Sequence, residues 1–146
     1  IYNWNITAAY KKYDVKSYYN SGLKEKPLQP RNIIFFNYGI QSNKINDKNW
    51  KFDITFNRLG KQRLVSNPRD NFEVVNPHFS INSQITRIFS LKFEVYIGGE
   101  NINNYKQENP IIMSDNPFDP MFDGSIIHGP IFGSVYYAGL RFKILN

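Results

Sequence analysis

Two histidines and several hydroxyl groups are the residues of this sequence that could carry nucleophilic catalysis. His78 is followed by Ser80 and Ser83, and His128 stands closer to the C-terminus. On a β-strand, residues 78 and 80 project in parallel from one face and do not converge. The sequence also has no Gly-x-Ser-x-Gly turn, which presents a nucleophilic serine to its base. We therefore predict that the protein is not an enzyme.

A second group of chemically capable side chains lies at residues 115–124, where acidic and amide side chains gather. Carboxylate and amide oxygens are the ligands that calcium prefers. The spacing lacks the alternating acidic positions and distant Glu of an EF-hand, and Pro117 and Pro120 are typical of turns in which Asx side chains cap backbone groups. A structural loop is the favoured interpretation, and a cation site is the alternative.

Gly98 and Gly99 precede Glu100 and form the third feature of interest. A phosphate-binding glycine loop needs a following helix, and no helical periodicity follows here. The two glycines therefore predict a β-bulge or a bend in a strand.

The elements that position these residues are strands, because six segments alternate between apolar and polar side chains. The clearest is WKFDITFN at residues 50–57, where four large apolar groups alternate with charged and polar ones. No segment shows a helical period, so the sequence predicts an all-β protein. We expect its strands at residues 2–10, 33–41, 50–57, 79–86, 91–97 and 135–145.

The alternation also predicts how the two faces of the sheet are populated, because register keeps the apolar sets of neighbouring strands together. We expect an apolar face that carries Phe36, Phe52, Ile54, Phe93, Val95, Leu140 and Phe142. The opposite face is expected to carry the charged residues Lys51, Asp53, Lys92, Glu94, Arg141 and Lys143.

Connection lengths alternate along the chain. Residues 14–30, 60–76 and 101–132 form long stretches between expected strands, whereas residues 43–47 and the segment near residue 90 are short. Short turns on one side and long loops on the other are typical of outer-membrane β-barrels.

Composition limits the remaining classes. No apolar run approaches the roughly 18 residues that a membrane helix needs, and the absence of Cys excludes thiolate sites. The net charge of +6 comes from scattered Lys and Arg residues, which does not suggest nucleic-acid binding. Aromatic residues make up 16% of the chain, and those near strand ends predict interfacial girdles: Trp4, Tyr10, Trp50, Tyr96 and Tyr136.

The second half of the chain contains the segment FEVYIGGENINNYKQ at residues 93–107. This segment resembles the penultimate barrel strand of TonB-dependent outer-membrane receptors of the Bacteroidetes type, where a pattern of the type gENltdyrq leaves the membrane. The resemblance continues in NPII at residues 109–112, DNPF at 115–118, FD at 122–123, GP at 129–130 and YAGLRF at 137–142. Weaker likeness occurs in WKFD at residues 50–53 and GKQRL at 60–64.

This resemblance implies an open, up-and-down fragment of a transmembrane barrel wall, with residues 1–146 as the C-terminal portion of the barrel domain. Family members enclose a plug in a barrel of about 22 strands, and six strands cannot close one. The plug is expected to lie outside these residues. The end Ile144-Leu145-Asn146 departs from the aromatic terminus that barrel sequences often carry, and Phe142 is the expected substitute.

The resemblance also implies partners and a location. We expect an outer-membrane protein that contacts lipid, the rest of the barrel and the plug, and that takes up a small-molecule or oligomeric nutrient when the TonB complex acts on the plug. It needs no cofactor. Lys51, Asp53, Lys92, Glu94, Arg141 and Lys143 are then candidates for the lumen. Residues 101–132 are expected to fold back over the sheet as an ordered loop, with Asp115, Asn116, Asp119 and Asp123 at the entrance for the ligand.

Two rival functions come from other classes. A secreted soluble β-sandwich that binds carbohydrate would pack its apolar face against a second sheet. A hydrolase embedded in an outer-membrane barrel would need Ser, His and acidic side chains that converge.

Overall fold

The computed structural model describes residues 2–20, 22–64, 74–108, 110–111, 113–120, 122–124, 127 and 129–144. Within these residues every regular element is a β-strand, and no helix is present. The described residues accordingly include no helix that is long and apolar enough to cross a membrane.

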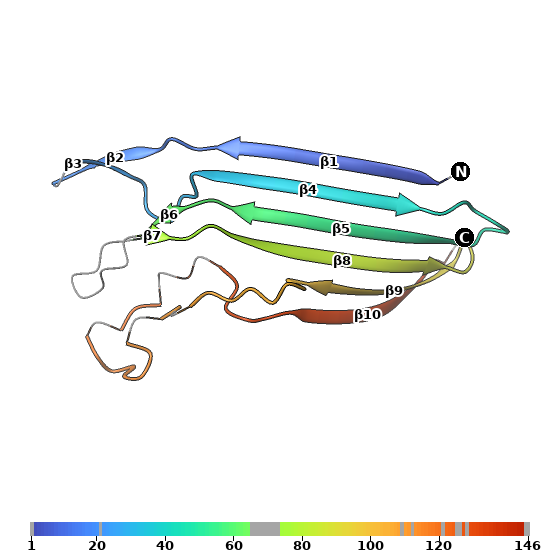
Figure 1. Ribbon diagram of the computed structural model, residues 1–146. Coiled ribbons are helices and arrows are strands. Elements are labelled where there is room, and N and C mark those ends of the chain that lie inside the picture. The colour runs from blue at the N-terminus through green and yellow to red at the C-terminus, as the bar shows by residue number, and fades with distance from the viewer. Residues whose placement is uncertain are drawn as a thin grey trace.

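Six long strands form one antiparallel sheet in the order β1-β4-β5-β8-β9-β10, as Figure 1 shows. Each strand of this sheet pairs with the sheet strand that precedes it along the chain, so the topology is up-and-down. The predicted all-β class and the six antiparallel strands are confirmed. The strand bounds are Asn3–Lys12, Asn32–Gln41, Asn49–Leu59, His78–Ile88, Phe93–Glu100 and Val135–Phe142.

Four short strands lie inside connections that the sequence predicted as loops. β2 (Lys16–Tyr19) pairs with β3 (Gly22–Glu25), and β6 (Gln62–Arg63) pairs with β7 (Val74–Val75). Strands of two to four residues are too short to display an alternating pattern, so the sequence offered no signal for them.

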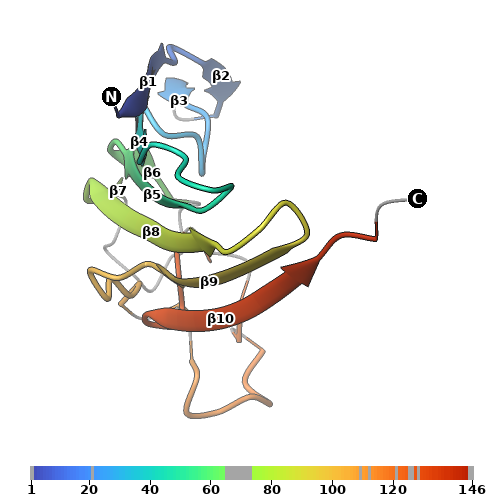
Figure 2. The ribbon, with the colours of Figure 1, turned by 90° about the vertical axis from the view of Figure 1, so that its right-hand side faces the viewer.

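The connections sort by length to the two ends of the sheet. Residues 13–31, 60–77 and 101–134 connect strands at one end, the long-connection end, and residues 42–48 and 89–92 do so at the other, the short-turn end. The β4–β5 turn is closed by reciprocal backbone hydrogen bonds between Ile45 and Lys48, with positive φ at Asn46 and Asp47. Such a turn matches the twist of antiparallel strands. That twist is visible in Figure 2, where β1 is seen nearly end-on and β10 lies across the view.

The register separates the side chains into two faces. The apolar face consists of the even-numbered residues of β1, β4, β5 and β10 and the odd-numbered residues of β8 and β9. The polar face consists of the remaining positions of these strands. Phe52 and Phe93 therefore lie on one face, and Asp53 and Glu94 lie on the other, as predicted.

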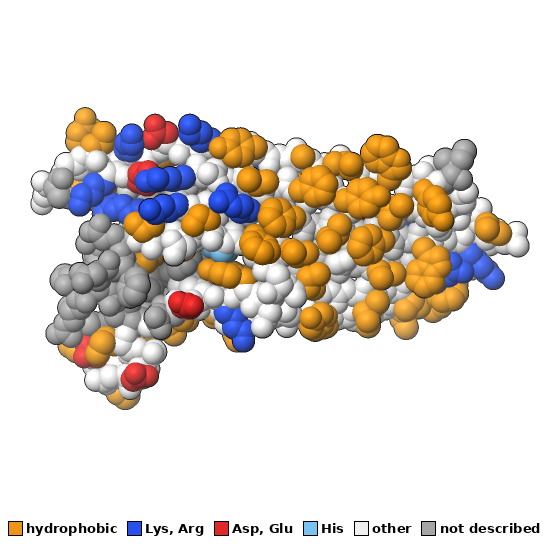
Figure 3. Space-filling model, in the orientation of Figure 1, with side chains coloured by type: hydrophobic (Ala, Val, Ile, Leu, Met, Phe, Trp, Pro, Cys, Tyr) orange, Lys and Arg blue, Asp and Glu red, His pale blue; other side chains and the backbone are white. Residues whose placement is uncertain are grey.

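The apolar face is uncovered in the part of the chain that the structure describes. Figure 3 shows hydrophobic side chains spread across the long strands, with charged side chains beyond the ends of this band. With the exception of Val135, every large exposed hydrophobic residue of the six strands belongs to the apolar face: Trp4, Ile6, Tyr10, Phe36, Trp50, Phe79, Ile85, Val95, Ile97, Tyr136, Leu140 and Phe142.

Burial is reversed relative to a soluble domain. Among the described residues, the buried hydrophobic side chains are Leu64 and Val75, which lie in or beside the small β6–β7 pair. By contrast, Asn49, Thr86 and Glu94 are buried on the polar face of the sheet. A soluble protein normally buries the apolar set of each strand and exposes the polar one.

Candidate functional site: the polar face and its mouth

The centre of the polar face carries side chains that form hydrogen bonds to one another, both within a strand and across strands. Asn37 of β4 donates to Thr55 Oγ1 of β5 over 2.9 Å, and the Gln84 amide donates to Thr86 Oγ1 over 3.0 Å. The Tyr137 hydroxyl of β10 donates to Gln84 Oε1 over 3.1 Å. These bonds hold polar groups in fixed directions on a surface that can face water or a polar partner.

The six lumen candidates all belong to the short-turn half of the sheet. Glu94 and Arg141 lie directly opposite each other on β9 and β10 and form an ion pair, in which Glu94 is largely buried and Arg141 is exposed. Lys51 and Asp53 project from the polar face of β5. Lys92 and Lys143 are exposed just outside the strands, where the Lys143 backbone N–H donates to the Lys92 carbonyl.

Two tyrosines and two glycines interlock on the polar face of β9 and β10. Tyr96 pairs with Gly139, and Gly98 pairs with Tyr137, so each aromatic ring lies over the glycine of the opposite strand. The rings of Tyr96 and Tyr137 meet edge to face with centroids 6.3 Å apart. One prediction was wrong here, because Tyr96 lies on the polar face and is not part of an aromatic girdle on the apolar face. Of the two alternatives predicted for Gly98 and Gly99, the β-bulge is excluded, because both glycines belong to an unbroken ladder.

The sequence signal that this interlock leaves is a repeated Tyr-x-Gly, at residues 96–98 and 137–139. Because antiparallel strands run in opposite directions, the two motifs place each Tyr opposite a Gly. Glycine supplies the space for a ring that packs along the sheet surface.

Filling that space should destabilise the sheet. An added Cβ at Gly98 or Gly139 would lie 2.5 Å from a tyrosine ring, so we expect Gly98→Ala and Gly139→Ala each to cost about 1–3 kcal/mol of unfolding free energy. Gly124→Ala is the matched control, because its Cβ would meet open space. Urea titration of the three variants measures the difference, and equal stabilities would exclude the interlock.

At the long-connection end, three asparagines fasten the chain where it leaves β9. Asn101 Nδ2 donates to the Tyr105 carbonyl over 2.7 Å, and Asn101 Oδ1 accepts from the Tyr105 N–H over 3.1 Å. Asn103 accepts from the Ile81 N–H and donates to the Phe79 carbonyl, both on β8. Asn101 and Asn104 have φ of 50° and 56°, a left-handed conformation that Asn tolerates. The NINN segment, residues 101–104, therefore has a structural role, and we term it the clasp.

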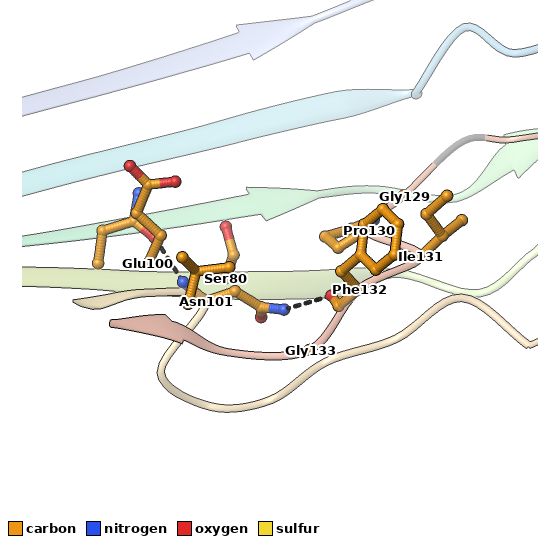
Figure 4. A pocket seen from close by; sticks show the side chains of 10 residues that line it. Ser80, Glu100, Asn101, Gly129, Pro130, Ile131, Phe132 and Gly133 are labelled. Atoms are coloured by element: carbon orange, nitrogen blue, oxygen red, sulfur yellow. Dashed lines mark hydrogen bonds between the residues drawn. The ribbon is translucent and has the colours of Figure 1, made fainter. Parts of the chain in front are cut away.

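A pocket of 410 Å³ opens on the polar face beside this clasp. Figure 4 shows Ser80, Glu100 and Asn101 on one side and Pro130, Ile131 and Phe132 on the other. Asn101 Nδ2 reaches the Phe132 carbonyl over 3.4 Å, which joins the two walls. The lining combines an exposed carboxylate, Glu100, with exposed apolar surface on Phe132 and Val135. Such a lining suits an amphiphilic ligand group better than a catalytic step.

The histidine candidate for catalysis has a packing role at the base of the same region. The buried His78 ring stacks on the Tyr105 ring with centroids 4.4 Å apart, and Gly129 approaches both rings. Gln107 accepts from the Gly129 N–H and donates its own N–H to the Pro130 carbonyl. Burial, and secondarily the charge of Glu108, raises the pKa of Tyr105 above its ordinary value. Ser80 lies two residues from His78 on the same face of β8, as the alternation predicted.

The connection between β9 and β10 does not fold back as a whole. Residues 101–108 and 129–134 are bonded to the sheet and to each other, whereas Phe118 is 95% exposed and Phe122 and Ile127 are also exposed. The prediction of a loop packed over the sheet was therefore wrong for these described residues of its distal half. Figure 2 shows the described part of this segment projecting away from the strands. Successive turns organise it, with Asn116, Asp119 and Phe122 each donating a backbone N–H to the residue three positions earlier.

The four entrance candidates belong to this projecting half. Asp115 and Asn116 are exposed, and Asp119 and Asp123 are partly buried. Over the described part of the chain, no group of three or more Asp, Glu, His or Cys side chains is arranged to hold a metal ion. The structure thus keeps the entrance candidates apart from the charged lumen candidates, which lie toward the opposite end of the sheet.

Comparisons with protein-family models, with curated proteins and with solved structures returned no match. Function is therefore inferred from the two faces of the sheet, the sorted connections and the sequence resemblance.

Proposed function

We propose that this chain forms part of the wall of an outer-membrane β-barrel, with its apolar face against lipid and its polar face toward the barrel interior. The proposal rests on one observation: the six-stranded sheet has an uncovered apolar face, and its opposite face carries ordered polar side chains. Lipid is the environment that stabilises such a surface, because every strand backbone can be paired and every apolar side chain remains out of water.

Dimensions and charges agree with this position. The six strands contain 8 to 11 residues, close to the length with which a tilted strand crosses a bilayer. The charged residues of the apolar face are Lys12, Arg58 and Arg87, and all three lie near strand ends. Arg87 stacks over the Trp50 ring at 4.8 Å and near Phe89 at 5.6 Å. A cation that shares an interface with aromatic rings is typical of the headgroup region.

The long-connection end is proposed to face the cell exterior and the short-turn end the periplasm. A single cysteine at either end tests this orientation in the full-length gene product, since these 146 residues contain none. We expect a membrane-impermeant maleimide to label Ser114→Cys on intact cells and to label Asn43→Cys only after the outer membrane is permeabilised. Recovery of the protein in the soluble secreted fraction would favour the carbohydrate-binding β-sandwich instead.

The resemblance of residues 93–142 to TonB-dependent receptors supports a more specific role, energised uptake of a nutrient through the complete barrel. The pocket beside Glu100 and Phe132 and the projecting residues 113–120 and 122–124 are then proposed to line the path of the ligand. Deletion of the encoding gene and deletion of TonB should abolish growth on the same limiting nutrient. A nutrient that is lost with the gene but retained without TonB would contradict the energised mechanism.

A further inference from the structure

The Lys and Arg residues at the long-connection end are concentrated on one part of the sheet. Described residues 11–31 and 58–64 contain only two carboxylates, Asp14 and Glu25. Each is already paired, Asp14 with Lys16 at 3.2 Å and Glu25 with Arg31 at 2.7 Å. The cations of the same two segments are Lys11, Lys12, Lys16, Lys24, Lys26, Arg31, Arg58, Lys61 and Arg63. A large excess of positive charge therefore remains.

Five of these cations form what we term the basic patch: Lys12, Arg31, Arg58, Lys61 and Arg63. They lie at the ends of three adjacent strands, β1, β4 and β5, and at the start of the β5–β8 connection. Figure 3 shows Lys and Arg side chains gathered beyond the apolar band at one end of the sheet.

Strand pairing and hydrogen bonds connect the segments that carry the basic patch. Lys12 pairs with Asn32 in the β1–β4 ladder, and Arg58 Nη1 donates to Asn32 Oδ1 over 3.2 Å. The Arg31 N–H donates to the Lys61 carbonyl over 2.9 Å. The Arg58 guanidinium is therefore held beside the start of β4, and the backbones of Arg31 and Lys61 are bonded to each other at the same end of the sheet.

The remaining arginine of the patch is fixed by its own contacts. Arg63 donates to the Glu25 carbonyl over 3.0 Å and lies over the Tyr19 ring at 4.9 Å. Glu25 therefore orients both arginines, Arg63 through its backbone carbonyl and Arg31 through its carboxylate. Oriented guanidinium groups lose less conformational entropy when they bind a phosphate.

Two members of the basic patch, Lys12 and Arg58, lie on the apolar face itself. Arg58 shares a row of that face with Tyr10 and Ile34, and Lys12 follows Tyr10 two positions later on the same side of β1. A ligand that covers both surfaces must combine hydrocarbon with negative charge. A polyanion such as a nucleic acid would leave the adjacent apolar surface exposed to water.

We infer that the basic patch binds the phosphate headgroup of a membrane lipid whose acyl chains lie along the apolar face. Guanidinium groups suit this ligand because they donate paired hydrogen bonds to phosphate oxygens. The inference rests on the proposed membrane position of the apolar face, and it adds a headgroup chemistry and a specific site. The β9–β10 connection, at the same end of the sheet, does not offer this chemistry. Its described residues include four carboxylates, Glu108, Asp115, Asp119 and Asp123, and one lysine, Lys106.

The test uses the full-length gene product in neutral detergent micelles. Phosphatidylglycerol and phosphatidylcholine with identical acyl chains are the two probes, and bound lipid is counted by native mass spectrometry. We expect the anionic lipid to bind more tightly at low ionic strength, and we expect this preference to fall as salt is added.

The decisive variant is Lys12→Gln/Arg58→Gln/Lys61→Gln. Each cation near an anionic headgroup is worth about a fivefold change in affinity, so the triple variant should lose roughly 100-fold of the preference. The control Lys44→Gln/Lys48→Gln/Lys143→Gln removes the same charge at the short-turn end and should keep most of it. Arg58→Lys, which retains the charge, should also bind. Equal losses in the two triple variants would overturn the assignment to this patch.

Two further outcomes separate the sources of failure. Competition by glycerol 3-phosphate as effective as that by phosphatidylglycerol would show a site for free phosphate, and it would overturn the lipid assignment. Absence of a preference for the anionic lipid, in a protein whose apolar face contacts lipid, would refute the basic-patch site alone. If the apolar face proves to contact water, both the proposed barrel wall and the lipid site at the basic patch are refuted.

Discussion

Arginine in place of Ile6 should destabilise the protein in a bilayer by about 2–4 kcal/mol, the cost of a cation on the lipid face of a barrel near the midplane. Ile6 is an exposed apolar residue in the middle of β1, in the same row as Tyr38 and Ile54. In a soluble protein an exposed Ile→Arg change would be nearly neutral. The sign and size of the effect therefore depend on what covers the apolar face.

Thr7→Arg is the matched control for this prediction. Thr7 is the next residue of the same strand, is also exposed, and lies on the polar face opposite Asn37. The two variants carry the same charge at almost the same depth, and only the face differs. Urea unfolding of the full-length protein in phospholipid vesicles gives both values. A difference below about 0.5 kcal/mol would be inconsistent with a lipid-facing Ile6.

Replacement of Asn101 by Ala should have the second large effect, about 2–4 kcal/mol, because it removes several buried hydrogen bonds at once. The side chain serves the backbone of Tyr105 through both its oxygen and its nitrogen, and it also reaches the Phe132 carbonyl. Asn101 is 8% exposed, so water cannot easily replace these partners. Alanine is further disfavoured by the φ of 50° at this position.

Asn101→Gly separates the two contributions to this loss, because glycine accepts the backbone conformation but makes none of the side-chain bonds. We expect it to be less damaging than Ala and still clearly destabilising. Limited proteolysis reports the local consequence, with faster cleavage within residues 101–134 in both variants. If Asn101→Ala is cut no faster than the parent protein, the clasp does not secure this connection.

Much of the sheet could be predicted from sequence because its strands alternate without interruption. Residues 50–57 carry large apolar groups at every second position, and β5 extends this pattern by only one residue at its start and two at its end. The predicted contrast in connection length is also present in the structure, where the long connections lie at one end of the sheet and the short ones at the other. The sequence placed Glu94 and Arg141 on one face of two predicted strands, and the register between β9 and β10 puts them directly opposite each other.

The details that failed depend on contacts between distant segments. The positions of Tyr96 and Gly98 depend on the pairing of β9 with β10, since Gly98 accommodates the Tyr137 ring and Gly139 accommodates the Tyr96 ring. The role of the NINN segment required knowing that Phe79 and Ile81 of β8 lie within its reach. The distal loop was expected to pack because of its apolar content, but hydrophobic composition alone does not specify what covers those side chains.

The barrel-wall account is tested most directly by fluorophores on cysteines introduced at Ile54 and Thr55, neighbours at the centre of β5 whose side chains lie on opposite faces. The full-length protein is reconstituted into vesicles, and quenching by lipids with brominated acyl chains is compared with quenching by aqueous iodide. We predict strong quenching by brominated lipid at Ile54→Cys and little at Thr55→Cys. Quenching of Ile54→Cys by iodide, with no effect of brominated lipid, would contradict a membrane position for the apolar face.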